Sequence, residues 1–162
     1  MVTASLAKRG AMDVVVFRVD EMVCGIPILD IQEIKRIHAH AEVHRAPRYV
    51  RGLVNMRGHI VTLVDVGQRL GLPPRALRRA APAIVVAHGD ELVGLLVDEI
   101  DDVVSAEPGD IVPAPSNLGG VEGHFLSAVL RTADGLVALV DKERIAGADA
   151  HAERDPGRRE GR

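Results

Sequence analysis

The side chains with the clearest potential for chemistry are three histidines that fall within one short segment. His38, His40 and His44 would lie on the same face of an extended chain, and three imidazoles can hold a zinc ion. Alanines separate these histidines, and the polar stretch around them offers no evident groups to orient the rings. A metal-dependent sensor built on this loop is therefore an alternative rather than the main prediction.

An acidic run and a lone cysteine are the other chemical candidates. The run 98–102 (DEIDD) lacks the spaced oxygens and the glycine of a calcium loop, so we predict a solvated turn after a buried strand. Cys24 follows an apolar run, with no second cysteine and no helix start beside it, which favours a buried core residue over a reactive thiolate. Phosphate-loop, dinucleotide-binding and nucleophile-elbow motifs are absent, so we predict no enzyme activity and no cofactor.

The most informative stretch is YVRGLVNMRGHIVTLVD, which begins at Tyr49 and predicts a hairpin. Alternation along its first strand places Asn55 and Arg57 together near the tip. One interpretation is structural: Asn55 satisfies the backbone of the turn and Arg57 is solvated. In the other, Arg57 pairs with a carboxylate, for which Glu33 is the obvious candidate, and fixes a docking surface that Ile31 borders.

Short apolar runs between turn residues must position these side chains. The sequence contains 23 valines and 10 isoleucines, and β-branched residues suit a pleated sheet. Very short connections at 20–21, 57–59, 88–91 and 133–135 join the runs in pairs, which predicts four hairpins and an antiparallel all-β fold. We expect strands over 13–19, 22–26, 52–57, 59–65, 83–88, 91–98, 124–131 and 136–141, with short helices over 28–37, after Asp65 and over 141–146.

A repeated sequence string suggests that the chain has two similar halves. The strings IVTLVD (60–65), VGLLVD (93–98) and LVALVD (136–141) each follow a tight turn and end on Asp, although such strings also recur by chance in a valine-rich chain. The stretch 70–82, rich in proline and arginine, is the predicted link between the halves. Arg75, Arg78 and Arg79 within it are predicted to form a solvated face, with a minor contact to an anionic partner as the alternative.

Composition limits the classes of partner. Apolar residues make up 47% of the chain, which favours a globular fold, and the formal net charge is only −3. Three aromatic residues are too few for a base-stacking platform, so we predict no nucleic-acid partner. No secretory leader or membrane span is evident, and we expect a cytoplasmic protein without direct membrane insertion. The folded part is predicted over 13–146, between a flexible start (1–12) and a disordered tail (147–162).

The hairpin and its surroundings resemble the CheW-like family of chemotaxis coupling proteins. The resemblance begins with VVVFRVDEMVCGIPILDIQEI from Val14 and continues with GLVNMRGHIVTLVD from Gly52. The later VGLLVD, the Val103–Val104 pair, the two prolines of PAP and the closing GLVALVDKERI extend it to Ile145.

This resemblance implies two five-stranded SH3-like β-barrels that share an apolar interface, with no catalytic activity. Members of the family are adaptors that couple methyl-accepting chemoreceptors to the regulatory domain of the histidine kinase CheA. A CheW-like adaptor of a parallel chemosensory pathway, controlling twitching motility or second-messenger output, is the alternative within the family. Matching positions imply a receptor-contacting groove and its supports at Ile31, Glu33, Gly52, Asn55, Arg57 and Val103, with Gly52 admitting a helical receptor tip.

Overall fold

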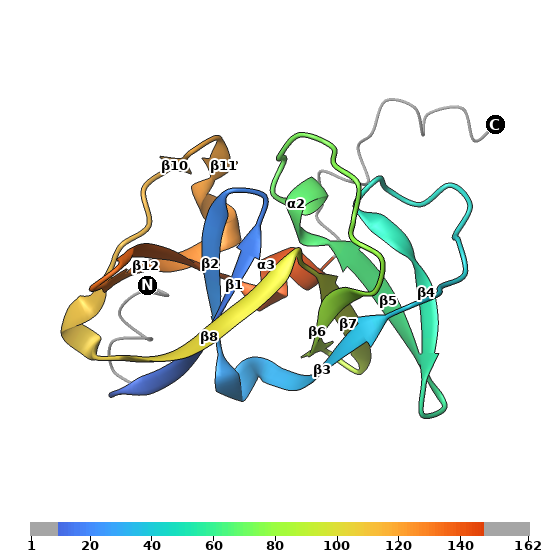
Figure 1. The fold of residues 1–162 in the computed structure, drawn as a ribbon, viewed down its shortest axis with the longest axis horizontal. Coiled ribbons are helices and arrows are strands. Elements are labelled where there is room, and N and C mark those ends of the chain that lie inside the picture. Colours follow the sequence, from blue (N-terminus) through green and yellow to red (C-terminus); the bar gives the residue numbers. More distant parts are fainter. Residues whose placement is uncertain (1–9, 148–162) are drawn as a thin grey trace.

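The computed structural model describes residues 10–147, and most of them lie in β-strands (Figure 1). The predicted flexible start and tail fall mainly at 1–9 and 148–162, outside the described residues. The strands are β1 (Met12–Val19), β2 (Met22–Pro27), β3 (Ile31–Ile37), β4 (Val50–Met56), β5 (His59–Asp65), β6 (Ala81–His88), β7 (Glu91–Leu96), β8 (Glu99–Ala106), β9 (Ile111–Val112), β10 (Asn117–Leu118), β11 (Val121–Glu122), β12 (Leu126–Thr132) and β13 (Gly135–Val140). The helices are short: η1 (Ile28–Asp30), α2 (Val66–Arg69), η2 (Pro108–Asp110), η3 (Gly123–Phe125) and α3 (Lys142–Ala146).

The strands form two main sheets, which confirms the all-β prediction. The first sheet has the order β8-β1-β2-β13-β12-β9, and the second has the order β3-β6-β7-β5-β4. Figure 1 shows the first sheet on the left and the second on the right. The first sheet has six strands rather than five, because the two-residue β9 pairs with β12. A separate two-stranded sheet joins β10 to β11.

The two sheets use the chain differently. All five strands of the second sheet come from 31–96, whereas the first sheet combines β1 and β2 with strands that follow residue 98. Residues 70–80, which we call the strap, join α2 to β6. The strap therefore connects strands of one sheet, and the prediction that 70–82 separates two halves of the chain does not match this topology.

Four tight hairpins occur where the turn residues predicted them. They join β1 to β2, β4 to β5, β6 to β7 and β12 to β13. In the β4–β5 turn, Arg57 (φ 54°) and Gly58 (φ 84°) both have the positive φ that suits the twist of a two-residue hairpin. In the β1–β2 turn it is Asp20 (φ 56°) that adopts this conformation, which Asp tolerates better than most side chains.

The predicted helix over 28–37 is wrong. Only Ile28–Asp30 is helical, and Ile31–Ile37 forms β3, which pairs antiparallel with β6. The apolar positions 28, 31, 34 and 37 match a helical spacing because the β3–β6 register shifts between Ile31 and Glu33, which interrupts the two-residue alternation of the strand. The predicted solvated turn at 98–102 is also wrong, because Glu99–Ala106 forms β8 at the edge of the first sheet.

Three apolar clusters hold the sheets together. One lies within the first sheet (Val14, Val16, Ala106, Ile111, Ala128, Leu130, Val137, Leu139) and one within the second (Ile37, Met56, Val61, Leu63, Ala81, Ala83, Val85, Leu96). The third, here called the shared cluster, takes buried residues from both sheets, among them Val15, Phe17, Val19, Cys24, Ile26, Val64, Ile84, Val86, Leu95, Ala138 and Ile145. The apolar interface expected between the halves is therefore present.

Strand alternation explains how one strand serves two clusters. In β6, Ala83 and Val85 face the cluster of the second sheet, whereas Ile84 and Val86 face the shared cluster. The strand is consequently apolar at every position from 81 to 86, as expected for a strand buried on both faces. This pattern is why the apolar runs read as continuous in the sequence.

Two of the aspartates that end strands accept hydrogen bonds at the start of the helix that follows. Asp65 accepts a hydrogen bond from the Gln68 N–H (3.3 Å) at the start of α2, and Asp141 accepts from the Glu143 and Arg144 N–H groups (3.0 and 3.3 Å) at the start of α3. These are N-cap contacts, and the cap expected at Asp141 is confirmed.

Candidate functional site

The predicted pairing of Arg57 with Glu33 is present. Arg57 Nη2 lies 3.6 Å from Glu33 Oε2. Glu33 comes from β3 and Arg57 from the β4–β5 turn, so the pair joins the two edge strands of the second sheet. The Arg57 side chain is 77% exposed and that of Glu33 is 28% exposed. An ion pair this open to water adds about 0–1 kcal/mol to stability, which leaves Arg57 free to serve an interface.

Asn55 completes the same turn. Its side-chain oxygen accepts a hydrogen bond from the Gly58 N–H at 2.9 Å, and Gly58 follows Arg57 directly. The structural interpretation of Asn55 therefore holds, since this contact fixes the turn that carries Arg57. Asn55 and Arg57 lie close together, as predicted, with Arg57 in the turn rather than in the strand.

Gly52, in β4, lies against a loop of the same chain. Its backbone has φ +152°, and a Cβ there would strike the carbonyl oxygen of Ala41 and the ring of His40. Ala41 and Leu53 exchange two backbone hydrogen bonds (2.9 and 2.8 Å), which hold this loop over Gly52. A loop of the same chain therefore lies against Gly52, and the expectation that Gly52 admits a helical receptor tip stays a prediction.

Ile31 and Val103 lie on different sheets. Ile31, in β3, is partly buried against the shared cluster. Val103, in β8, is 49% exposed and pairs with Val15 of β1. Both strands lie at sheet edges. Leu29, in η1 just before β3, is 87% exposed. The structure thus pairs Glu33 with Arg57, while Asn55 closes the turn that carries Arg57 and Val103 presents apolar surface on the other sheet.

A cavity of about 410 Å³ opens between the two sheets. One wall comes from β3, through Ile34, Lys35 and Arg36, and the opposite wall is Asp98 with the start of β8. Arg57 is not among the residues that line it. This cavity lies farther along β3 than Glu33, and the receptor-contacting groove at Arg57 stays a prediction.

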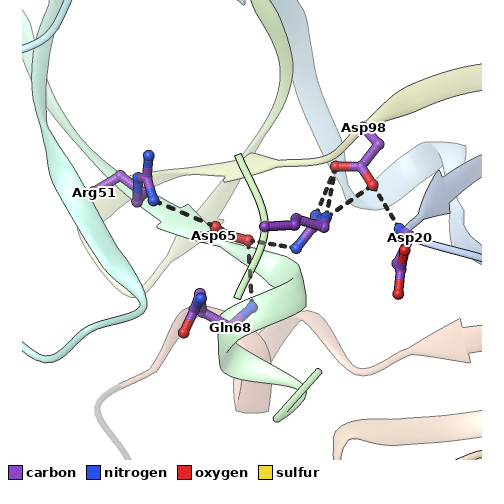
Figure 2. A network of polar contacts seen from close by, with 6 residues as sticks. Asp20, Arg51, Asp65, Gln68 and Asp98 are labelled. Atoms are coloured by element: carbon purple, nitrogen blue, oxygen red, sulfur yellow. Dashed lines mark hydrogen bonds and ion pairs between the residues drawn. The ribbon is translucent and has the colours of Figure 1, made fainter. Parts of the chain in front are cut away.

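Sequence reasoning missed a network of charged residues beneath the strap (Figure 2). Arg75 binds Asp98 with two atoms, Nη2 to Oδ1 (2.6 Å) and Nε to Oδ2 (2.9 Å). Its Nη1 lies 3.4 Å from Oδ1 of Asp65, which is fully buried. Asp98 also accepts the backbone N–H of Asp20 (2.5 Å), and Arg51 approaches Asp65 Oδ2 at 3.9 Å.

This network corrects the prediction that the strap arginines are all solvated. Arg78 and Arg79 are exposed, but the Arg75 side chain is only 15% exposed. Partial burial acts to raise the pKa of Asp98, but the hydrogen bonds from Arg75 and Asp20 outweigh it and hold that pKa below its usual range. Burial acts to lower the pKa of Arg75, and its two aspartate partners raise it overall. Asp98 and Arg75 are therefore both charged, and their ion pair holds the strap.

A sign of this network was present in the sequence. Asp65 and Asp98 end two of the three repeated strings, and both bind the one arginine of the strap that is largely buried. No local spacing rule links position 75 to position 98, so the pairing itself could not be read from the pattern.

The remaining chemical candidates show no reactive arrangement. Across residues 10–147, no three His, Cys, Asp or Glu side chains gather as a metal site would require, so His38, His40 and His44 do not converge. Cys24 is buried, and its burial raises the pKa of the thiol to about 12, which suppresses the thiolate. None of the helices in the described part of the chain has the length and apolar character needed to cross a bilayer.

Known proteins resemble this chain in sequence. Residues 13–150 match the family described as CheW-like domain. The chain is 29% identical over 137 residues to the chemotaxis protein CheW of Rhizobium meliloti (strain 1021), covering 85% of this chain and 88% of that one. It is 22% identical over 113 residues to protein FrzA of Myxococcus xanthus, covering 70% of this chain and 71% of FrzA.

The fold is also found in a solved structure. The crystal structure of the scaffolding protein TtCheW from Thermoanaerobacter tengcongensis superposes with a TM-score of 0.78 at 22% identity, and the match covers 85% of this chain and 89% of that chain. The likeness agrees with the assignment of the two sheets to paired SH3-like barrels.

Proposed function

Because the chain belongs to the CheW-like domain family over residues 13–150, we propose that it is a non-enzymatic adaptor that couples chemoreceptors to a CheA-type histidine kinase in the cytoplasm. Its partners are the cytoplasmic signalling tip of a receptor and the regulatory domain of the kinase. The observation that carries the proposal is the family match, which spans nearly all of the folded region.

The geometry supports the receptor surface at the edges of the two sheets. Arg57 and Glu33 form an exposed charged pair on the second sheet, and Val103 adds apolar surface on the first. Apolar area with a few fixed charges at its rim is the usual composition of a protein–protein interface. Ile31 and Asn55 support this surface by packing and by closing the turn, and Gly52 supports it by leaving room for the Ala41 loop.

Signal transfer by such an adaptor needs no reaction in this chain. The adaptor holds receptor and kinase in a fixed geometry, and a change in the receptor acts on the kinase through contacts that differ between two states. Each contact is expected to be weak, because an array of many copies gains avidity from repetition.

Binding to a receptor signalling fragment tests the surface. Arg57→Ala is expected to weaken binding by about 1–3 kcal/mol, since a charge at a desolvated rim is lost, while the free energy of unfolding changes by less than about 1 kcal/mol. Glu33→Lys should weaken binding further by placing two cations together. Arg131→Ala, which removes an exposed arginine from the first sheet, is the matched control and should bind as the wild type does. Unchanged binding of both Arg57→Ala and Glu33→Lys would remove these residues from the site.

A CheW-like adaptor of a parallel chemosensory pathway, such as one for twitching motility or second-messenger control, is the second candidate, and the similarity to FrzA favours keeping it. Copurification of the native complex, with identification of the receptor and the kinase, separates the two.

A further inference from the structure

A groove lies at the turn end of the β1–β2 hairpin, away from the surface around Arg57. It has a volume of about 510 Å³ and opens between the β1–β2 turn, the strap and the β10–β11 turn. Its apolar lining includes Met22, Leu72, Leu118 and Leu136. This volume falls in the range of sites that hold a small ligand or a few side chains.

The floor of this groove is packed against the core. Met22, Leu72 and Leu118 pack against the shared cluster, and the buried Ala138 belongs to that cluster. Leu136, by contrast, is 58% exposed at the groove's edge, although it is a large aliphatic side chain. The groove therefore combines a packed base with one unburied apolar wall, as a preformed binding site does.

The charged network fixes the distance between two walls. Asp98 accepts the backbone N–H of Asp20 from the hairpin wall and binds Arg75 from the strap, whose Leu72 and Pro73 form the opposite wall. Arg75 itself lies against Gly67, where a Cβ would have no room. The two walls are thus joined through one carboxylate, and binding would require little rearrangement.

The charge around the groove selects the partner. The only charged residues in the lining are Asp20 and Glu21, and both are exposed. Residues 10–27 and 98–147, which build the first sheet and its loops, hold thirteen Asp and Glu against four Lys and Arg. Residues 28–97, which include the strap wall of the groove, hold six Asp and Glu against ten Lys and Arg, but none of these charged residues lines the groove. A cationic partner is therefore attracted to the first sheet in particular.

We propose that this groove docks a segment of another protein in which an aliphatic side chain stands beside a lysine or arginine. The aliphatic side chain fills the space over Leu72, Leu118 and Leu136, and the cation meets Asp20 and Glu21 at the rim. The site is separate from the receptor surface: it lies at the Met22 end of β2, whereas η1 and β3 follow the other end, about 17 Å away at the rise of a strand.

A titration followed by methyl NMR tests this. The probes are two capped peptides, Gly-Lys-Leu-Arg-Gly and Gly-Glu-Leu-Glu-Gly, added to the full chain. The cationic peptide is expected to shift the methyl signals of Leu72, Leu118 and Leu136 in a saturable way that weakens with salt. The acidic peptide is expected to leave them unchanged. Equal effects of both peptides, or shifts confined to other methyl groups, would overturn the proposal.

Two variants separate the apolar and the charged contributions. Leu136→Ser should weaken the cationic peptide about tenfold by removing the exposed wall, and Leu29→Ser, at an exposed leucine outside the groove, should not. Asp20→Asn combined with Glu21→Gln should weaken it about three- to tenfold and remove its salt dependence. Asn tolerates the positive φ at position 20, so the turn is retained and thermal unfolding checks this directly.

A second copy of this chain is the competing occupant. Sedimentation at rising protein concentration decides between them, because self-association that Leu136→Ser abolishes would assign the groove to a second copy and refute the proposal. A protein that remains monomeric and binds the cationic peptide supports it.

Discussion

Replacing Arg75 by Met is the sharpest test of how the strap is held. Met keeps an unbranched apolar stem but loses the guanidinium, which leaves the fully buried Asp65 with the Gln68 N–H (3.3 Å) and, as its one remaining cation among residues 10–147, Arg51 at 3.9 Å. Removing one partner of a buried ion pair costs about 3–5 kcal/mol. Because Asp98 is partly exposed and is partly satisfied by the Asp20 N–H, we expect the lower end, about 3 kcal/mol.

Urea denaturation followed by circular dichroism measures this loss. For a folded region of this size, about 3 kcal/mol corresponds to a fall of roughly 10 °C in the melting temperature. Arg79→Met is the matched control, since Arg79 is an exposed arginine of the same strap, and it should change the free energy of unfolding by less than about 0.5 kcal/mol. Adding Asp65→Asn to Arg75→Met should restore part of the loss, because the orphaned charge is then gone.

Equal free energies of unfolding for Arg75→Met and Arg79→Met, within about 0.5 kcal/mol, would refute this role of Arg75. That result would mean that water reaches Asp65 in solution, or that the strap is not held by its arginine. A loss that the second substitution does not reduce would mean that packing of the Arg75 stem, and not its charge, stabilises the strap.

Three further predictions follow from single residues. The pKa of Asp98 is depressed in the folded protein, so its stabilising effect is present above the pKa of an unfolded aspartate and is lost as pH falls through the folded pKa; the stability gap between wild type and Asp98→Asn should therefore narrow on acidification in a pH series of urea melts. Gly52→Ala should destabilise the protein by about 2 kcal/mol in chemical denaturation, because the new Cβ meets the Ala41 carbonyl; a stability equal to that of wild type would show that the loop moves aside at little cost. Cys24 in the folded protein should resist a chromogenic thiol reagent at pH 8 and react fully after unfolding, as followed by the absorbance of the released chromophore. Rapid labelling of the folded protein would contradict the burial of this thiol.

The hairpins could be predicted because their determinants are local. Turn residues at Asp20, Gly58 and Gly89 lie between apolar runs, and each adopts a positive φ that its residue type tolerates. The contact between Arg57 and Glu33 could also be predicted from the sequence. Arginine is always charged and pairs well with carboxylates, and Glu33 was the evident carboxylate for an exposed turn at this position.

The edge strands could not be predicted by the same rules. β3 carries a register shift that interrupts its alternation, so its isoleucines imitate a helix. β8 begins EIDDVVSA, and its charged residues made it read as a solvated turn, yet charges along an edge strand are a common way to prevent pairing with another chain. The Arg75–Asp98 pair and the loop over Gly52 depend on tertiary contacts between segments with no shared pattern.

The division of the first sheet along the chain sets an order on synthesis. β1 and β2 leave the ribosome early, but β13 and β12, which complete their sheet, are made more than a hundred residues later. At ordinary translation rates this delay is roughly 6–20 seconds. A lone hairpin is only marginally stable in water, whereas the uninterrupted 31–96 stretch can assemble all its strands first. The second sheet can therefore form first, and the β1–β2 hairpin can pack against it before β8, β12 and β13 are made.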